Sequence, residues 1–335
     1  MRINPVDPRT LADDELTMMH EILTAVAAND HPDLPAPARG DLEERLTYPW
    51  PGCRLACWLG WDNERTRALG LAWLMLPGDA NSGVAELTLA VLPGDRRSGA
   101  GRGLLREAVR LAYSMGRTTM IAAAEDGGAA ADFAVAMGAR PALNDVHAVL
   151  QVSPPTDPPT AGGSGDYELL RLRGATPPEL LAALGAVHEG MADAPVGTST
   201  WSHQRYDGSR VAAVDSTLEA RGLVQLRVLA RHRPTGDIVG VTYVIVSPRS
   251  PYRSEQGDTT VLPAHRGNRL GLAMKVEMLH WLSADYPEVR ELNTWVAQDN
   301  APIRAVNAQL GYRVAGHWTH WQADVPDLAK LLGMT

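Results

Sequence analysis

The feature that most constrains the fold is a segment that occurs twice in the chain, 170 residues apart. The stretch VLPGDRRSGAGRGLL spans residues 91–105, and VLPAHRGNRLGLAMK spans residues 261–275. Each begins at the end of an apolar run, passes through a loop rich in arginine and glycine, and ends in a helical pattern. A second pair, AMGAR at 136–140 and QLGYR at 309–313, repeats at nearly the same offset. Repeats at one offset indicate two copies of one fold.

The segment between the copies predicts where the chain divides. Residues 153–165, SPPTDPPTAGGSG, contain four prolines and three glycines and almost nothing apolar. Because such a composition cannot pack into a core, we expect an exposed linker there. The 335 residues would then form two domains, residues 1–152 and 166–335, which is an ordinary size for each.

Hydrophobic periodicity predicts a mixed α/β fold for each half, with one strand–loop–helix unit near its middle. In the first half we expect helices at 10–28, 37–47, 99–116 and 128–137, and strands at 53–61, 67–76, 84–92, 118–124 and 146–152. In the second half we expect helices at 177–191, 267–284 and 301–310, and strands at 167–173, 222–232, 238–247, 256–262, 289–296 and 312–323.

Composition excludes several classes of protein. The net charge of −8 argues against a general nucleic-acid binder, which needs a basic face. Cys53 and Cys57 lack a second pair of metal ligands, so we expect two reduced thiols in the core and no metal. The first residues have no apolar signal segment, and no run approaches the length of a membrane span. We therefore expect a cytoplasmic protein that does not bind membranes.

The repeated loop has the chemistry of a phosphate site. A helix N-terminus presents unpaired N–H groups and a partial positive charge, glycine lets the backbone approach a ligand, and arginine adds charged hydrogen bonds. The alternative is an ordinary surface turn, but two copies at matched positions favour the phosphate site. The loop lacks the Gly-Lys-Ser/Thr ending of a nucleotide-binding P-loop, and it follows the fourth strand rather than the first strand of a dinucleotide fold.

The loop resembles a known motif. Residues 96–101, Arg-Arg-Ser-Gly-Ala-Gly, resemble the Arg/Gln-x-x-Gly-x-Gly/Ala motif of the GNAT acyl-CoA-dependent N-acetyltransferases. The second copy, residues 266–271, matches at its first and last positions and carries Arg269 in place of the first glycine. The stretches HRGNRLGLAMK and TWVAQDNAPIRAVNAQLGYR are similar to the C-terminal half of actinobacterial tandem GNAT proteins, an architecture shared by mycothiol synthase.

The resemblance implies two tandem GNAT domains, each a mostly antiparallel sheet with splayed strands 4 and 5 flanked by helices. It implies acetyl-CoA as cosubstrate, with the pantetheine arm between the splayed strands and the diphosphate on the loop. It assigns cofactor binding to Val91, Leu92, Arg96, Arg97, Gly99, Ala100, Gly101, Arg102, Val261, Leu262, Arg266, Gly267, Asn268, Arg269, Leu270, Gly271, Asn300 and Asn307.

The resemblance also implies a carboxylate base on strand 4 and a strand-4 backbone N–H that polarises the thioester carbonyl. Glu86 matches the base position in the first half, although it could equally be an edge residue facing solvent. In the second half the offset of 170 leads to Gln256. By strand alternation Asp258 lies on the same face as Gln256, so we expect Asp258 to be the base, with Glu255 as a second acid. The alternative for Asp258 is a structural hydrogen-bond acceptor.

The family's thiolate-protonating tyrosine is missing from both halves. Its position is Asn307 in the second half and Ala134 in the first. The proton must then come from water or from another side chain, or one half is inactive. Asn300 matches a family residue that helps to hold the cofactor, but it could instead be a helix N-cap.

We therefore expect an N-acetyltransferase that acetylates a primary amine of a small molecule, such as an antibiotic, an amino sugar or a thiol precursor, mainly in its C-terminal half. One alternative is a non-catalytic acyl-CoA-binding protein with two degenerate repeats. Another is an acyltransferase that uses a different acyl-CoA or a protein amine. The sequence leaves open a monomer or a homodimer.

Overall fold

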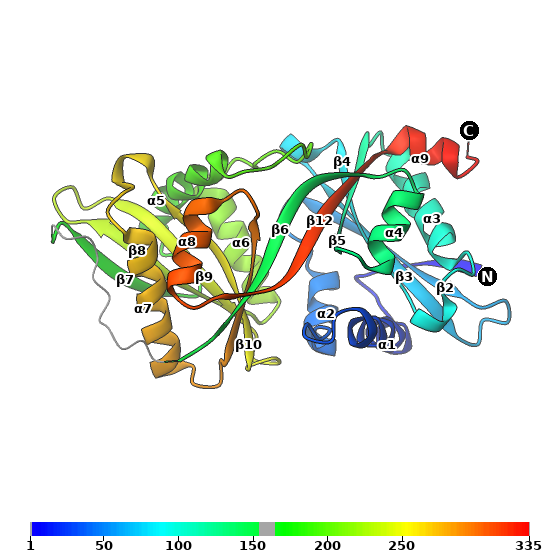
Figure 1. Ribbon diagram of the computed structural model, residues 1–335, viewed down its shortest axis with the longest axis horizontal. Coiled ribbons are helices and arrows are strands. Elements are labelled where there is room, and N and C mark those ends of the chain that lie inside the picture. Colours follow the sequence, from blue (N-terminus) through cyan, green and yellow to red (C-terminus); the bar gives the residue numbers. More distant parts are fainter. Residues whose placement is uncertain (1, 154–164, 335) are drawn as a thin grey trace. The chain divides into compact units, whose positions relative to one another are not determined.

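The computed structural model describes residues 2–153 and 165–334 (Figure 1). Its chain forms two compact units. In the described residues, the first unit consists of 2–144, 196–202 and 318–334, and the second of 145–153, 165–195 and 203–317. Of the predicted linker at 153–165, residues 154–164 lie outside the described part of the chain.

The first unit contains a mixed sheet with the strand order β1-β2-β3-β4-β5-β12. Its strands are β1 (Arg2–Val6), β2 (Cys53–Trp61), β3 (Ala68–Pro77), β4 (Val84–Val91), β5 (Thr119–Glu125) and β12 (Arg313–Asp324). Neighbouring strands are antiparallel except β4 and β5, which run parallel. Cys57 is buried in β2 and Cys53 is partly buried, and both thiols are free.

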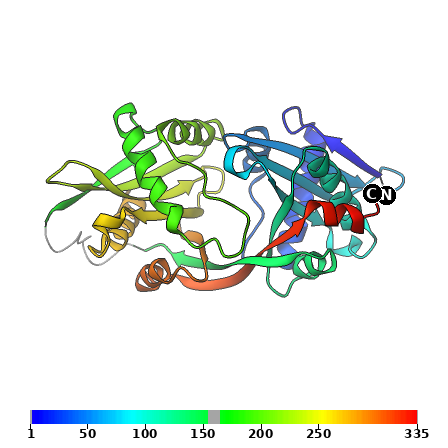
Figure 2. The ribbon, with the colours of Figure 1, turned by 90° about the horizontal axis from the view of Figure 1, so that it is seen from above.

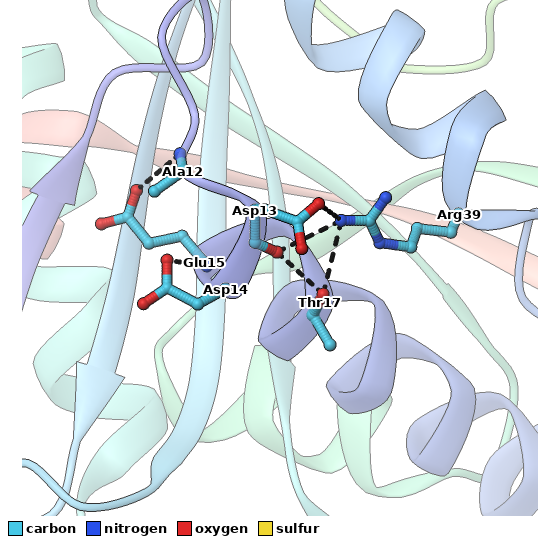
Figure 3. A network of polar contacts seen from close by, with 6 residues as sticks. All are labelled: Ala12, Asp13, Asp14, Glu15, Thr17 and Arg39. Carbon is cyan, nitrogen blue, oxygen red and sulfur yellow. Dashed lines mark hydrogen bonds and ion pairs between the residues drawn. The ribbon is translucent and has the colours of Figure 1, made fainter.

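Helices cover both faces of this sheet. On one face, α1 (Asp13–Asp30) and α2 (Arg39–Thr47) bury Met19 and Leu42 against the strands. On the other, α3 (Ala100–Ser114) packs its apolar stripe with α4 (Ala129–Ala136) and the C-terminal α9 (Val325–Leu331). Arg39, at the start of α2, donates to the Asp13 carbonyl at the start of α1, which ties the two helices together (Figure 3).

The second unit repeats this arrangement, with the strand order β6-β11-β10-β9-β8-β7. Its strands are β7 (Tyr167–Arg173), β8 (Val224–His232), β9 (Ile238–Val246), β10 (Arg253–Val261), β11 (Glu291–Ala297) and β6 (Arg140–Gln151). Its helices are α5 (Pro178–Glu189), α6 (Gly208–Ala220), α7 (Leu270–Asp285) and α8 (Ala301–Gln309). α5 and α6 pack on one face and α7 on the other (Figure 2).

The sheets confirm the expected mixed fold with one parallel pair, β4–β5 or β10–β11, in each unit. The last strand of each sheet comes from the other half of the sequence. Residues 318–324 of β12 pair with β5, and residues 145–151 of β6 pair with β11. A fifth strand left as a bare edge would expose unpaired backbone groups, and these partners cover it.

The periodicity missed three elements. β1 is only five residues long and includes a proline, so it shows no clear alternation. α6 begins with Gly-Ser and mixes apolar and polar residues with little helical order, and α9 has seven residues. These segments take their structure mainly from packing rather than from local propensity.

Candidate active site

In each unit the fourth and fifth strands separate after three paired residues. β4 pairs with β5 only from Val84 to Glu86, yet it continues to Val91. β10 pairs with β11 only from Arg253 to Glu255, yet it continues to residue 261. The edge of each fourth strand beyond these pairs therefore has backbone groups without a strand partner in the described sheet. Such an edge fits the amides of a pantetheine arm.

Each separated strand leads into a loop with the same backbone path. Two positions in each loop are left-handed: Arg97 (φ 63°) and Gly99 (φ 91°) in the first, Gly267 (φ 84°) and Arg269 (φ 57°) in the second. Each copy thus has glycine at one of the two positions, which explains how Arg269 can replace the motif glycine. Gly99 and Arg269 immediately precede α3 and α7, whose first N–H groups have no acceptor within the helix. These helix starts fit a diphosphate.

The first arginine of each motif braces its loop. Arg96 donates from Nε to the Val91 carbonyl at 3.3 Å and from its terminal nitrogens to Asp30 at 2.9 and 2.5 Å. Arg266 likewise donates to the carbonyl of residue 261 at 2.9 Å and to Asp193 at 2.5 Å. Both guanidinium groups therefore have carboxylate partners that the motif did not reveal. Direct contact of Arg96 and Arg266 with a diphosphate stays a prediction.

β10 contains a bulge that β4 lacks. β4 pairs with β3 without interruption, whereas the pairing of β10 with β9 shifts between Gln256 and Thr259. Gly257 and Asp258 together stand opposite the single residue Tyr243, which is the arrangement of a β-bulge. The bulge takes these two residues out of the regular ladder.

The bulge corrects two predictions. Asp258 and Gln256 do not share a face, because the extra residue breaks the alternation. Gln256 donates to Thr242 Oγ1 at 3.1 Å, whereas Asp258 accepts from the Tyr243 hydroxyl at 3.4 Å. The counterpart of Glu86 is also Glu255 rather than Gln256, since each of these glutamates is the last residue paired with the fifth strand.

The carboxylates of the second unit lie among aromatic residues. Burial raises the pKa of Asp258, although the hydrogen bond from Tyr243 and the charge of His203 act in the other direction. Burial and the charges of Asp258, Tyr206 and Glu255 raise the pKa of Tyr243. The cluster therefore combines two acids with two tyrosines.

His188 of α5 completes this cluster, with its ring centre 4.7 Å from that of Tyr206. Burial, together with the charge of Arg227, lowers the pKa of His188 to about 4, so this imidazole is neutral. Tyr206, Tyr243, His188 and His203 were absent from the sequence prediction. They come from three separate segments and form no motif.

Asn307 has an unexpected partner. The buried side chain of Asn307 accepts a hydrogen bond from Lys275 Nζ at 2.8 Å. Asn300 is the N-cap residue of α8, as one of the two interpretations predicted, but its side chain makes no capping hydrogen bond. A cofactor contact for Asn300 or Asn307 stays a prediction.

The first unit also has an acid at its strand separation. Glu86 is half-buried; burial raises the pKa of its carboxyl, and the charges of Arg45 and His320 oppose that rise. The interpretation of Glu86 as a solvent-facing edge residue is therefore wrong. A Cβ at Gly101 would lie 3.4 Å from the ring of Phe133, so this aromatic side chain lies against the start of α3.

Comparison with known proteins agrees with this geometry. Residues 17–139 match the acetyltransferase (GNAT) family. A tandem GNAT protein from the clavulanic acid biosynthesis pathway, solved without acetyl-CoA, is 28% identical and superposes with a TM-score of 0.82 over 97% of this chain and 98% of that one. The chain is a tandem GNAT protein.

More distant structures share the fold of this tandem GNAT protein. A GCN5-related N-acetyltransferase from Sphaerobacter thermophilus is 15% identical, with a TM-score of 0.68 over 96% of both chains. A glucosamine N-acetyltransferase region of a fungal multi-domain β-N-acetylglucosaminidase is 14% identical, with a TM-score of 0.64 over 96% of this chain and 38% of that one. A search of curated proteins finds no match to the sequence.

The tandem GNAT protein was also searched for metal and membrane features. Across residues 2–153 and 165–334, no group of three or more His, Cys, Asp or Glu side chains is arranged to hold a metal ion. Over the same residues, no helix combines the length and the apolar character needed to cross a bilayer.

Proposed function

We propose that this protein is an acetyl-CoA-dependent N-acetyltransferase that acts on a primary amine of a small molecule, and that its second unit carries out the reaction. The observation that carries the proposal is the bulge in β10. It brings Asp258 beside Tyr243 and near Glu255, next to the open strand edge and the phosphate loop. The first unit has the same edge and loop, but its β4 is unbroken.

The residues of the second unit have the properties that amide formation requires. Bound acetyl-CoA supplies the activated acetyl group. Asp258 takes the proton that the attacking amine loses, and its raised pKa makes it a stronger base than an ordinary aspartate. Tyr243 orients this carboxylate by donating a hydrogen bond to it. We assign polarisation of the thioester carbonyl to the backbone of the bulge at Gly257.

The test compares one substitution at matched positions of the two loops. Gly101→Glu and Gly271→Glu each add an acid to the first turn of a helix, where it favours folding but repels a diphosphate. We expect Gly271→Glu to abolish thiol release from acetyl-CoA with a panel of small amines, and Gly101→Glu to retain it. The opposite result would assign the reaction to the first unit.

The panel also separates the other candidate reactions. Saturable binding of acetyl-CoA without thiol release for any amine would make the protein a non-catalytic acyl-CoA binder. Competing acyl-CoAs, with products weighed by mass spectrometry, test the acyl preference. A lysine-containing peptide in the same panel tests a protein amine as acceptor.

A second function fits the first unit alone. Its open edge and loop can bind acyl-CoA, while its unbroken β4 provides no bulge beside Glu86. We propose that the first unit binds acyl-CoA without catalysis. Titration calorimetry of Gly271→Glu should then still show one saturable site, and a variant with no binding heat would refute this role.

A further inference from the structure

Lys275 is a buried amine in a chain that almost avoids lysine. Of the 31 lysine and arginine residues, only Lys275 and Lys330 are lysines. Lys330 is exposed on α9, whereas Lys275 lies inside the second unit with 2% of its surface exposed. Burying an amine costs free energy unless something compensates for the lost water. The position therefore needs an explanation beyond packing.

The surroundings of Lys275 offer little to hold a positive charge. Its Nζ donates to Asn307 Oδ1 at 2.8 Å and lies 5.0 Å from the centre of the Tyr312 ring. Burial alone lowers the pKa of Lys275 to about 7, with no contribution from a carboxylate or from any charged group on β8, β9 or β10, against which α7 packs. Near neutral pH both protonation states of this amine are therefore populated.

The first unit shows that the fold does not need this pair. At the matching positions it has Leu105 and Ala134, and Leu105 is part of the apolar core. The same two helices thus pack with apolar side chains in one unit and with Lys275 and Asn307 in the other. The polar pair occurs in the unit that also has the bulge.

The helix directs Lys275 toward the open strand edge. Lys275 lies one turn after Gly271, on the same side of α7. A Cβ at Gly271 would contact Thr259, which follows the bulge on β10, at 3.7 Å. Because helical side chains lean toward the helix N-terminus, the amine of Lys275 extends back toward this edge, where α8 presents Asn307.

We propose that Lys275 is the general acid of the reaction and that Asn307 positions it. As the bond between the acetyl carbon and sulfur breaks, its electron pair goes to sulfur, and the ammonium group of Lys275 gives sulfur a proton. The product is the free thiol of CoA, and the neutral amine regains a proton from solvent. The inference rests on the proposed acetyl transfer in the second unit.

Nuclear magnetic resonance can test this contact without measuring turnover. Protein labelled only at lysine gives two side-chain signals, and Lys330→Arg identifies which one belongs to Lys275. We expect Lys275 to titrate near pH 7 in the free protein. With CoA its titration should move up by about one pH unit or more, because the thiolate favours the charged amine. Desulfo-CoA, which lacks the thiol, should not cause this shift.

Kinetics give the second readout. Lys275→Met keeps the length of the side chain without the proton, and we expect kcat to fall by about 100-fold. In the original protein the rate should decline as pH rises through the pKa of Lys275, and this decline should be absent in the variant. Leu105→Met, at the matching position of the first unit, is the control and should change neither quantity.

Three results would overturn the role of Lys275. One is an identical Lys275 titration with CoA and desulfo-CoA when both bind. Another is an unchanged kcat and pH profile in Lys275→Met. The third is an acetyl group found on Lys275 itself by mass spectrometry during turnover, which would make it a nucleophile. Absence of any CoA binding would instead refute the proposed function.

Discussion

Gly257 is the residue on which the geometry of the β10 bulge depends. A Cβ added there would lie 2.0 Å from Cε2, 2.2 Å from Cζ and 2.6 Å from the hydroxyl oxygen of Tyr243. Its φ is not in the left-handed region, so alanine itself would be unstrained and the cost comes from the ring. Overpacking of this kind costs about 1–3 kcal/mol, and moving the ring also loses the hydrogen bond to Asp258. We expect Gly257→Ala to lower the free energy of unfolding by about 2–3 kcal/mol.

A double-mutant cycle with Tyr243→Ala isolates this cause. Without the ring, Gly257→Ala should be neutral or should stabilise by about 0.4–1 kcal/mol through the unfolded chain. Urea denaturation of the four proteins should therefore give a coupling free energy of about 2 kcal/mol or more between the two positions. If Gly257→Ala costs the same in both backgrounds, the ring of Tyr243 does not lie over residue 257, and the arrangement of the bulge is wrong.

Three further predictions concern stability. Gly99→Ala should lower the free energy of unfolding by about 1–2 kcal/mol, because φ is 91° with no atom near the added Cβ, whereas Gly94→Ala, equally unobstructed and without positive φ, should change it little in thermal denaturation. Asp215→Ala should cost about 3–5 kcal/mol in urea titrations, since Arg227, 1% exposed, loses its carboxylate partner. His188 has a pKa of about 4 when folded and 6.5 as its ordinary value, so the unfolded chain binds more protons between these pH values. Stability should fall by an amount on the order of 3 kcal/mol as pH drops from 6.5 to 4, and His188→Gln should remove this component.

The repeat at an offset of 170 residues predicted the fold well because each copy carries its own local signals. Strand alternation, the apolar stripe of α3 and the glycines of the loops all act over a few residues. The splayed strands and the two helix starts followed from these signals together with the family resemblance. The partners that brace Arg96 and Arg266 could not be predicted, since Asp30 and Asp193 lie more than 60 residues away in the chain.

The bulge shows why a constant offset fails within a strand. The offset of 170 holds from Gly240 and Val261 onward, but one extra residue at 257–258 shifts the pairing before it. Glu255 therefore takes the place of Glu86, and Asp258 changes face. Nothing in RSEQGDTTV marks the extra residue except Gly257, whose importance appears only when Tyr243 is seen to lie over it.

The sequence alone thus determined the class of fold, the presence of two copies and the loops that can receive a phosphate, because periodicity, turn residues and helix starts are local. Only the tertiary structure decided which side chains surround the reaction. It placed Tyr243 against Asp258, Lys275 against Asn307, and the last strand of each half in the other unit's sheet. Those outcomes depend on contacts between distant segments, and their free energy comes from burial and pairing that no local pattern records.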